Sequence, residues 1–175
     1  ASAQKGLKDL GVKKGTRVAA FVPNCVETVI LMLAVAASGA IWTSCSPDFG
    51  SQGVIDRFGQ VEPSILVVAN GYNYNGKVFG LEEKINGVLE TIDSIKNVIC
   101  IDFVSVSCNL IHNSIISYKE LLSISGNKPN FAQLPFDHPL YIMYSSGTTG
   151  PPKSIVHGAG GTLIQHMKEH QLQCD

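Results

Sequence analysis

Short strand-like runs alternate with segments of helical periodicity along most of this 175-residue chain. The run from Ser64 to Ala69 (S-I-L-V-V-A) is continuously apolar, which is typical of a strand buried on both faces of a sheet. Apolar residues between Leu81 and Ile92 then recur at spacings of 4, 3, 1 and 3, as they do on one face of a helix. This alternation predicts an α/β fold in which helices flank a mostly parallel sheet. Strands are expected at 16–22, 40–45, 64–69, 97–103, 140–144 and 154–157.

Polar residues mark the expected starts of the helices. Asn24, Ser51 and Thr162 each precede a helical pattern and are expected to be N-caps. Ser117 and Glu120 have the spacing of a capping box, in which each side chain bonds the other residue's backbone N–H. The remaining polar or irregular segments, at 70–76, 104–117 and 127–139, are expected to be loops.

Composition excludes several classes of protein. The chain has 13 Lys+Arg and 14 Asp+Glu, so its net charge of −1 lacks the basic excess of a nucleic-acid-binding surface. Only 15% of its residues are charged and 45% are apolar, which excludes a disordered tail and predicts an unusually apolar exterior. We therefore expect a segment of a larger protein. The longest apolar stretch, Val29 to Trp42, is too short for a transmembrane segment, which needs about 20 residues.

The cysteines indicate a reducing compartment. There are five of them, an odd number, and no C-x-x-C pair occurs. Cys25, Cys45 and Cys100 lie in apolar surroundings and are expected to be core residues and not nucleophiles. A cytoplasmic location in the cytosol is therefore expected.

A loop rich in small and hydroxylic residues, 144–153, is the segment most informative about chemistry. After a predicted strand it places four hydroxyls, two glycines and a lysine within nine residues. Such a loop suits a polyanion, because its N–H groups and hydroxyls can donate to phosphate oxygens and its lysine adds a charge-assisted bond. A solvated turn of ordinary kind is the alternative. The expected phosphate-binding residues are Ser145, Ser146, Gly147, Thr148, Thr149, Gly150 and Lys153.

The loop differs from the P-loop of nucleotide triphosphatases at one position. Residues 147–154 fit G-x-x-x-x-G-K-[ST] except that Pro152 replaces the second glycine. Proline has no N–H for a phosphate oxygen and its φ is fixed near −65°, so it cannot replace that glycine. The P-loop interpretation is therefore set aside.

The same loop resembles the [YF]-[TS]-S-G-[TS]-T-G-x-P-K signature of the adenylate-forming superfamily. Flanking sequences are similar, more narrowly, to the acetoacetyl-CoA synthetases, and the resemblance covers nearly the whole chain except 104–114. The segments that carry it are 134–140, 155–166, 40–44, 46–50, 56–58 and 74–77.

The resemblance implies that residues 1–175 are part of a large N-terminal AMP-binding domain, without its C-terminal domain. It implies an acid–CoA ligase that converts acetoacetate, ATP and CoA into acetoacetyl-CoA, AMP and pyrophosphate through an acyl-adenylate, with Mg²⁺ accompanying ATP. The partners would be these small molecules, with no nucleic acid, and the oligomeric state stays open. The resemblance assigns no certain catalytic residue and no metal ligand within the segment, which alone is expected to be inactive.

The resemblance also implies a CoA contact region at Phe49, Gly50 and Lys77, where the alternative is a helix-entry turn and a solvated lysine. Arg57 is expected to be a structural partner on its own helix.

The sequence also permits other interpretations. The full enzyme could activate another short acid, such as acetate or propionate, or the chain could be a truncated product that binds nucleotide or a partner without turnover. His166, Glu169 and His170 spell H-x-x-E-H, a zinc pattern, but a surface helix of mixed charge explains them better.

Overall fold

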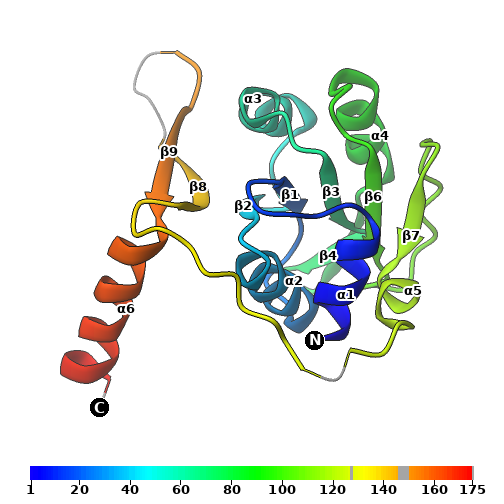
Figure 1. The fold of residues 1–175 in the computed structure, drawn as a ribbon. Coiled ribbons are helices and arrows are strands. Elements are labelled where there is room, and N and C mark those ends of the chain that lie inside the picture. The colour runs from blue at the N-terminus through cyan, green and yellow to red at the C-terminus, as the bar shows by residue number, and fades with distance from the viewer. Residues whose placement is uncertain (127, 146–149, 175) are drawn as a thin grey trace.

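The computed structural model describes residues 1–126, 128–145 and 150–174. In this part of the chain helices and strands alternate and form the α/β fold that the sequence predicts (Figure 1). The strands are β1 (Arg17–Phe21), β2 (Ile41–Cys45), β3 (Ile65–Ala69), β4 (Gly71–Tyr74), β5 (Lys77–Gly80), β6 (Asn97–Ile101), β7 (Ile115–Ser117), β8 (Pro139–Ser145) and β9 (Lys153–Gly158). The helices are α1 (Ser2–Asp9), α2 (Val26–Ala37), α3 (Ser51–Val61), α4 (Glu82–Thr91), α5 (Tyr118–Leu122) and α6 (Ala159–Gln173).

A seven-stranded sheet in the order β7-β6-β3-β1-β2-β8-β9 forms the centre of the molecule. Its neighbouring strands are parallel, except that β8 and β9 form an antiparallel pair. The strands β4 and β5 form a separate antiparallel hairpin. The prediction of a mostly parallel sheet is therefore confirmed.

The core lies in two layers, one on each face of the sheet. On β3, Ile65 and Val67 pack in the layer that contains residues of α1, α2 and α5, whereas Leu66 and Val68 pack in the layer with residues of α3 and α4. Every residue of β3 is buried, which explains the continuously apolar run in its sequence.

The connections between strands change face near the middle of the sheet. The chain passes from β1 to β2 through α2 on one face, and from β3 to β6 through α4 on the other face. Because β1 and β3 are neighbours, their following segments diverge at the carboxyl ends of these strands. In open α/β sheets such a switch point is where ligands bind.

Helix starts follow the predicted caps in one case and differ in three. The Ser117–Glu120 capping box is confirmed, with bonds of 3.1 Å and 2.8 Å. The N-caps of α2, α3 and α6 are Cys25, Gly50 and Gly158, so the predictions of Asn24, Ser51 and Thr162 were wrong.

Contacts from elsewhere in the chain account for the early start of α6. The N–H of Ala159 donates to the carbonyl of His138 at 2.8 Å, and the N–H of Gly160 donates to Phe136 at 2.9 Å. Two of the free N–H groups of the first turn are thus satisfied without a side-chain cap, and α6 begins before Thr162.

Two segments that were expected to be loops contain strands. Asn75 and Gly76 have φ angles of 48° and 72°, as a two-residue hairpin turn requires, and they join β4 to β5. Ile115 to Ser117 adds β7 to the sheet beside β6.

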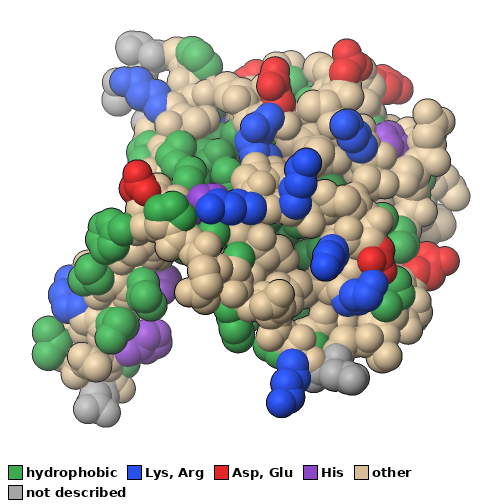
Figure 2. Space-filling model, viewed as in Figure 1, with side chains coloured by type: hydrophobic (Ala, Val, Ile, Leu, Met, Phe, Trp, Pro, Cys, Tyr) green, Lys and Arg blue, Asp and Glu red, His purple; other side chains and the backbone are tan. Residues whose placement is uncertain are grey.

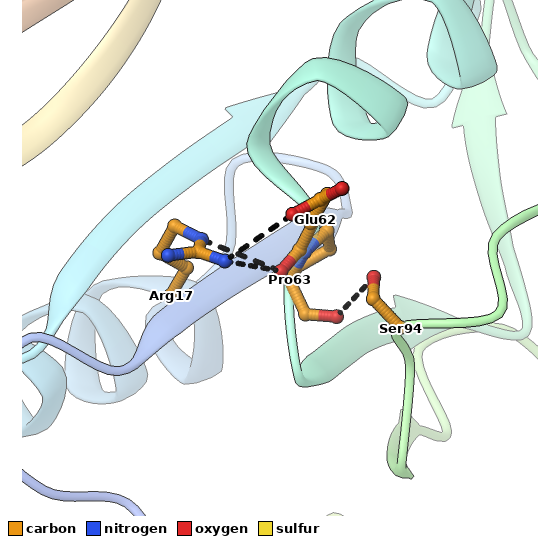
Figure 3. A network of polar contacts seen from close by, with 4 residues as sticks. All are labelled: Arg17, Glu62, Pro63 and Ser94. Carbon is orange, nitrogen blue, oxygen red and sulfur yellow. Dashed lines mark hydrogen bonds and ion pairs between the residues drawn. The ribbon is translucent and has the colours of Figure 1, made fainter.

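The turn between α3 and β3 is held by a polar network (Figure 3). Glu62 has a φ angle of 48°, in the left-handed region that non-glycine residues rarely occupy. Nε and Nη2 of Arg17 donate to the carbonyl of Glu62 at 3.3 and 3.2 Å. Ser94 Oγ donates to the carbonyl of Pro63 at 2.9 Å. The network thus joins the start of β1 to the end of α3.

The exterior is apolar at the β8–β9 and α6 side of the molecule, as the low charge content predicted. Figure 1 shows α6 projecting from the body, and Figure 2 shows apolar side chains on its surface. Leu163, Ile164 and Met167 are all exposed. Within the described ranges, no helix is both long and apolar enough to cross a membrane.

Candidate functional site

The predicted phosphate-binding loop lies between β8 and β9. Ser145, the last residue of β8, and Lys153, the first of β9, are register partners, so the structure brings the two ends of the loop together. Gly150 has a φ angle of 106°, and an added Cβ would meet no atom within 4 Å. Backbone conformation and not space therefore calls for glycine there. Ser146, Gly147, Thr148 and Thr149 lie outside the described residues.

The strand that enters this loop is fixed by a buried hydroxyl. Thr43 Oγ1, on β2, donates to the carbonyl of Ile142 at 2.8 Å and shares a hydrogen bond of 2.9 Å with the hydroxyl of Tyr144. Burial raises the pKa of Tyr144 to about 12. Because its hydroxyl stays protonated, this bond holds the residue before Ser145 against the parallel part of the sheet.

Arg57, on α3, lies between two aromatic rings. Its Cζ is 4.4 Å from the centre of the Phe49 ring and 5.8 Å from that of Tyr144, which are cation–π distances. Its Nη1 donates to the carbonyl of Gly53 at 2.6 Å. Arg57 is therefore bonded within its own helix, as expected, and also connects the Phe49 turn with the base of the loop.

A pocket of about 640 Å³ opens at the carboxyl ends of β1 and β2, beside the β4–β5 hairpin. This position agrees with the switch point of the sheet. The pocket is lined by residues 22–24, 28, 44–48 and 72–74.

The three predicted CoA contact residues are neighbours of residues that line this pocket, but they do not line it themselves. Phe49 and Gly50 follow the lining residue Asp48 directly, and Gly50 is the N-cap of α3. Lys77 is exposed at the start of β5, opposite the lining residue Tyr74.

A second cation near the pocket was missed by the sequence reasoning. Lys84 Nζ donates to the carbonyl of Pro47 at 3.2 Å and lies 5.9 Å from the centre of the Tyr72 ring. In the sequence, Lys84 is an ordinary polar residue of a helical pattern, with no signal of a binding role. Only the packing of α4 against the turn after β2 places it here.

The other candidate groups have structural surroundings. Burial raises the pKa of both Cys45 and Cys100 to about 12, which keeps these thiols protonated. The ring of His157 lies 5.1 Å from that of Tyr141, its register partner. His166 and His170 both lie on α6. In the described part of the chain, no three His, Cys, Asp or Glu side chains group as metal ligands.

Comparison with known proteins is consistent with this architecture. The family described as AMP-binding enzyme matches residues 2–174. An acetoacetyl-coenzyme A synthetase of Rhizobium meliloti is 45% identical over 174 residues, which is 98% of this chain and 26% of that protein. A malonamoyl-CoA synthetase of Penicillium aethiopicum is 40% identical over 98% of this chain and 25% of that protein.

A solved structure has the same fold. The acetoacetyl-CoA synthetase from Streptomyces lividans superposes with a TM-score of 0.93 and 40% identity, covering 100% of this chain and 26% of that one. The chain thus spans about a quarter of the length of the relatives it matches. It belongs to the family of AMP-binding enzymes.

Proposed function

We propose that this chain supplies the phosphate-binding part of an ATP-dependent acid–CoA ligase whose acid substrate is acetoacetate. The observation that carries the proposal is the pairing of Ser145 with Lys153, which brings a hydroxyl-bearing residue and a lysine together at the ends of the signature loop. The printed names of the relatives supply the reaction class and the acid.

In the first half-reaction a carboxylate oxygen of acetoacetate attacks the α-phosphorus of ATP. A new O–P bond forms, and the bond to pyrophosphate breaks. Lys153 carries a positive charge on a flexible stem, and Ser145 carries a hydroxyl donor. Placed beside the β- and γ-phosphates, with Ser146, Gly147, Thr148, Thr149 and Gly150, they would stabilise the negative charge that grows on the leaving group.

In the second half-reaction the CoA thiol attacks the acyl carbon, loses its proton and displaces AMP. We place the nucleotide of CoA near Phe49, Gly50 and Lys77. The pocket beside these residues and the added cation of Lys84 support this placement, because an anionic nucleotide needs local positive charge.

Mg²⁺ would accompany ATP and neutralise part of its phosphate charge. In residues 1–126, 128–145 and 150–174, no three His, Cys, Asp or Glu side chains group as metal ligands, and none of these residues is assigned to the ion. We place the enzyme in the cytosol. The five cysteines are free, which fits a reducing compartment.

The test is acid-dependent exchange of labelled pyrophosphate into ATP by the full-length gene product. Acetoacetate is expected to support the exchange best in a panel with acetate, propionate and malonamate. Malonamate belongs in the panel because a malonamoyl-CoA synthetase is among the relatives. Lys153→Met should lower the exchange at least about 10-fold, because one charge-assisted bond contributes roughly 1.5–3 kcal/mol.

Lys96→Met is the matched control, because Lys96 is an exposed lysine directly before β6. If another acid of the panel supported faster exchange than acetoacetate, that acid would replace acetoacetate as the proposed substrate. Exchange with none of the acids, while the protein still binds ATP, would favour a non-catalytic nucleotide-binding product. Full exchange by Lys153→Met would refute the role given to this lysine.

A further inference from the structure

Gln60, near the end of α3, bonds the residues on both sides of Lys153. Its Nε2 donates to the carbonyl of Pro152 at 2.9 Å. Its Oε1 accepts a hydrogen bond from Ser154 Oγ at 3.0 Å. These residues are separated from Gln60 by 92 and 94 positions in the sequence, so the contact belongs to the tertiary fold.

The orientation of this amide is itself fixed. Nε2 of Gln60 also donates to the carbonyl of Asp56 at 2.6 Å, on the preceding turn of the helix. An amide has two N–H donors, and here one is directed to Asp56 and the other to Pro152. The Oε1 atom is thereby turned toward Ser154. A long side chain on the surface is in this way held in one conformation.

The backbone of Lys153 is consequently held from two directions. On one side it pairs with Ser145 across the β8–β9 ladder. On the other side Gln60 holds its two neighbours to α3. A lysine side chain is long and flexible, so the place its ammonium group reaches depends on how firmly its backbone is fixed.

We infer that Gln60 is a positioning residue for Lys153, setting the lysine for the pyrophosphate leaving group during adenylation. The inference rests on the proposed function. Gln60 contacts neither the substrate nor the reacting atoms and acts through Pro152 and Ser154. A misplacement of about 1 Å at a reacting centre can cost about 100-fold in rate, so two hydrogen bonds at this point have kinetic weight.

The chain offers a matched control on the same helix. Gln52 is also an exposed glutamine of α3, and its Nε2 donates to Asp56 Oδ1 at 2.7 Å. Substitution by methionine keeps the length of either side chain and removes its hydrogen bonds. Gln60→Met should lower kcat for ATP–pyrophosphate exchange about 10-fold, while Gln52→Met should change it less than about 2-fold.

A double-mutant cycle separates positioning from general stability. If Gln60 acts through Lys153, Gln60→Met should have no further effect on exchange in a Lys153→Met background. Ser154→Ala, which removes one of the two bonds, should give a smaller loss than Gln60→Met. The melting temperature of each variant should stay within a few degrees of the wild type, because Gln60 is exposed.

Amide hydrogen exchange tests the contact without relying on activity. In the full-length gene product, Gln60→Met should increase exchange in a peptide that contains Lys153 and Ser154, and Gln52→Met should not. Unchanged protection, or equal losses in the single and Lys153→Met backgrounds, would overturn the inference. Wild-type pyrophosphate exchange by Lys153→Met would refute the role that the proposed function gives to this lysine, and with it the positioning role of Gln60, even if hydrogen exchange confirmed the contact.

Discussion

The guanidinium group of Arg57 lies over the ring of Phe49, with its Cζ 4.4 Å from the ring centre. Phe49 directly precedes Gly50, the N-cap of α3, and Arg57 comes from the same helix. Phe49 is 36% exposed, so the residue is in contact with the cation and still accessible to a ligand. This arrangement gives the proposed CoA region a rigid aromatic wall.

Loss of that cation should weaken CoA use more than adenylation. Arg57→Leu removes a cation–π contact of about 0.5–1 kcal/mol, which corresponds to an increase of about 2- to 5-fold in KM for CoA. The KM for ATP in pyrophosphate exchange should change less. Steady-state kinetics of the full-length gene product measure both, and Arg17→Leu, at the amino end of β1, is the control. An unchanged KM for CoA would argue against Phe49 as part of the CoA region.

The turn at Glu62 should be improved by glycine. A non-glycine residue in the left-handed region destabilises the fold by roughly 1–2 kcal/mol. Glycine removes this strain, but its greater conformational freedom in the unfolded chain offsets part of the gain in stability. Arg17 bonds the carbonyl of Glu62, which glycine retains. The ion pair between Arg17 Nη2 and Glu62 Oε2, at 3.8 Å, is exposed and contributes little to stability. Glu62→Gly should therefore stabilise the fold by about 0.5–1 kcal/mol in urea unfolding.

Glu62→Ala is the informative control for this substitution, because alanine loses the ion pair and keeps the backbone strain. It should be no more stable than the wild type. Equal stability of the glycine and alanine variants would mean that strain at this position is not the dominant contribution.

Stability should fall in alkaline solution through Cys45. Burial raises the pKa of its thiol from 9.0 to about 12, whereas the charge of Arg57 acts in the opposite direction. Between these two values the folded state binds more protons than the unfolded state, so the stabilising contribution is complete below about pH 9 and is lost as the pH rises toward 12. Urea unfolding at pH 7 to 10.5 measures this slope. Cys45→Ala should make it shallower, and Cys174→Ala, at an exposed position, should not.

Local patterns were sufficient for elements that are determined by their own residues. The apolar run of β3 predicted two-sided burial because each of its residues meets a core layer. The Ser117–Glu120 box was predictable because both partners lie within one turn. Asn75-Gly76 is a dipeptide typical of hairpin turns, but the polar composition of 70–76 predicted a loop, and the β4–β5 hairpin was missed.

Contacts between distant segments could not be predicted in this way. The early start of α6 depends on carbonyls of Phe136 and His138. The residues of the signature loop were identified from their chemistry, whereas the contact of Gln60 with Pro152 joins residues 92 positions apart. Hydrogen bonds across such separations follow from the packing of α3 beside β9. The periodicity of a local segment does not predict which distant segment packs against it.

The two-sided burial of β1 and β3 restricts where members of such a family can diverge in specificity. A polar or bulkier residue at Ala19 or Val67 would disturb one core layer or the other, since both side chains are fully buried. The segments that follow β1 and β2, and residues 72–74 of β4, line a pocket, and several of their residues, such as Asn24, Asp48 and Tyr74, lie outside both core layers. New acid or nucleotide preferences are therefore expected to arise by substitutions at the carboxyl edge of the sheet, while the central strands accept little beyond exchanges among apolar residues of similar volume.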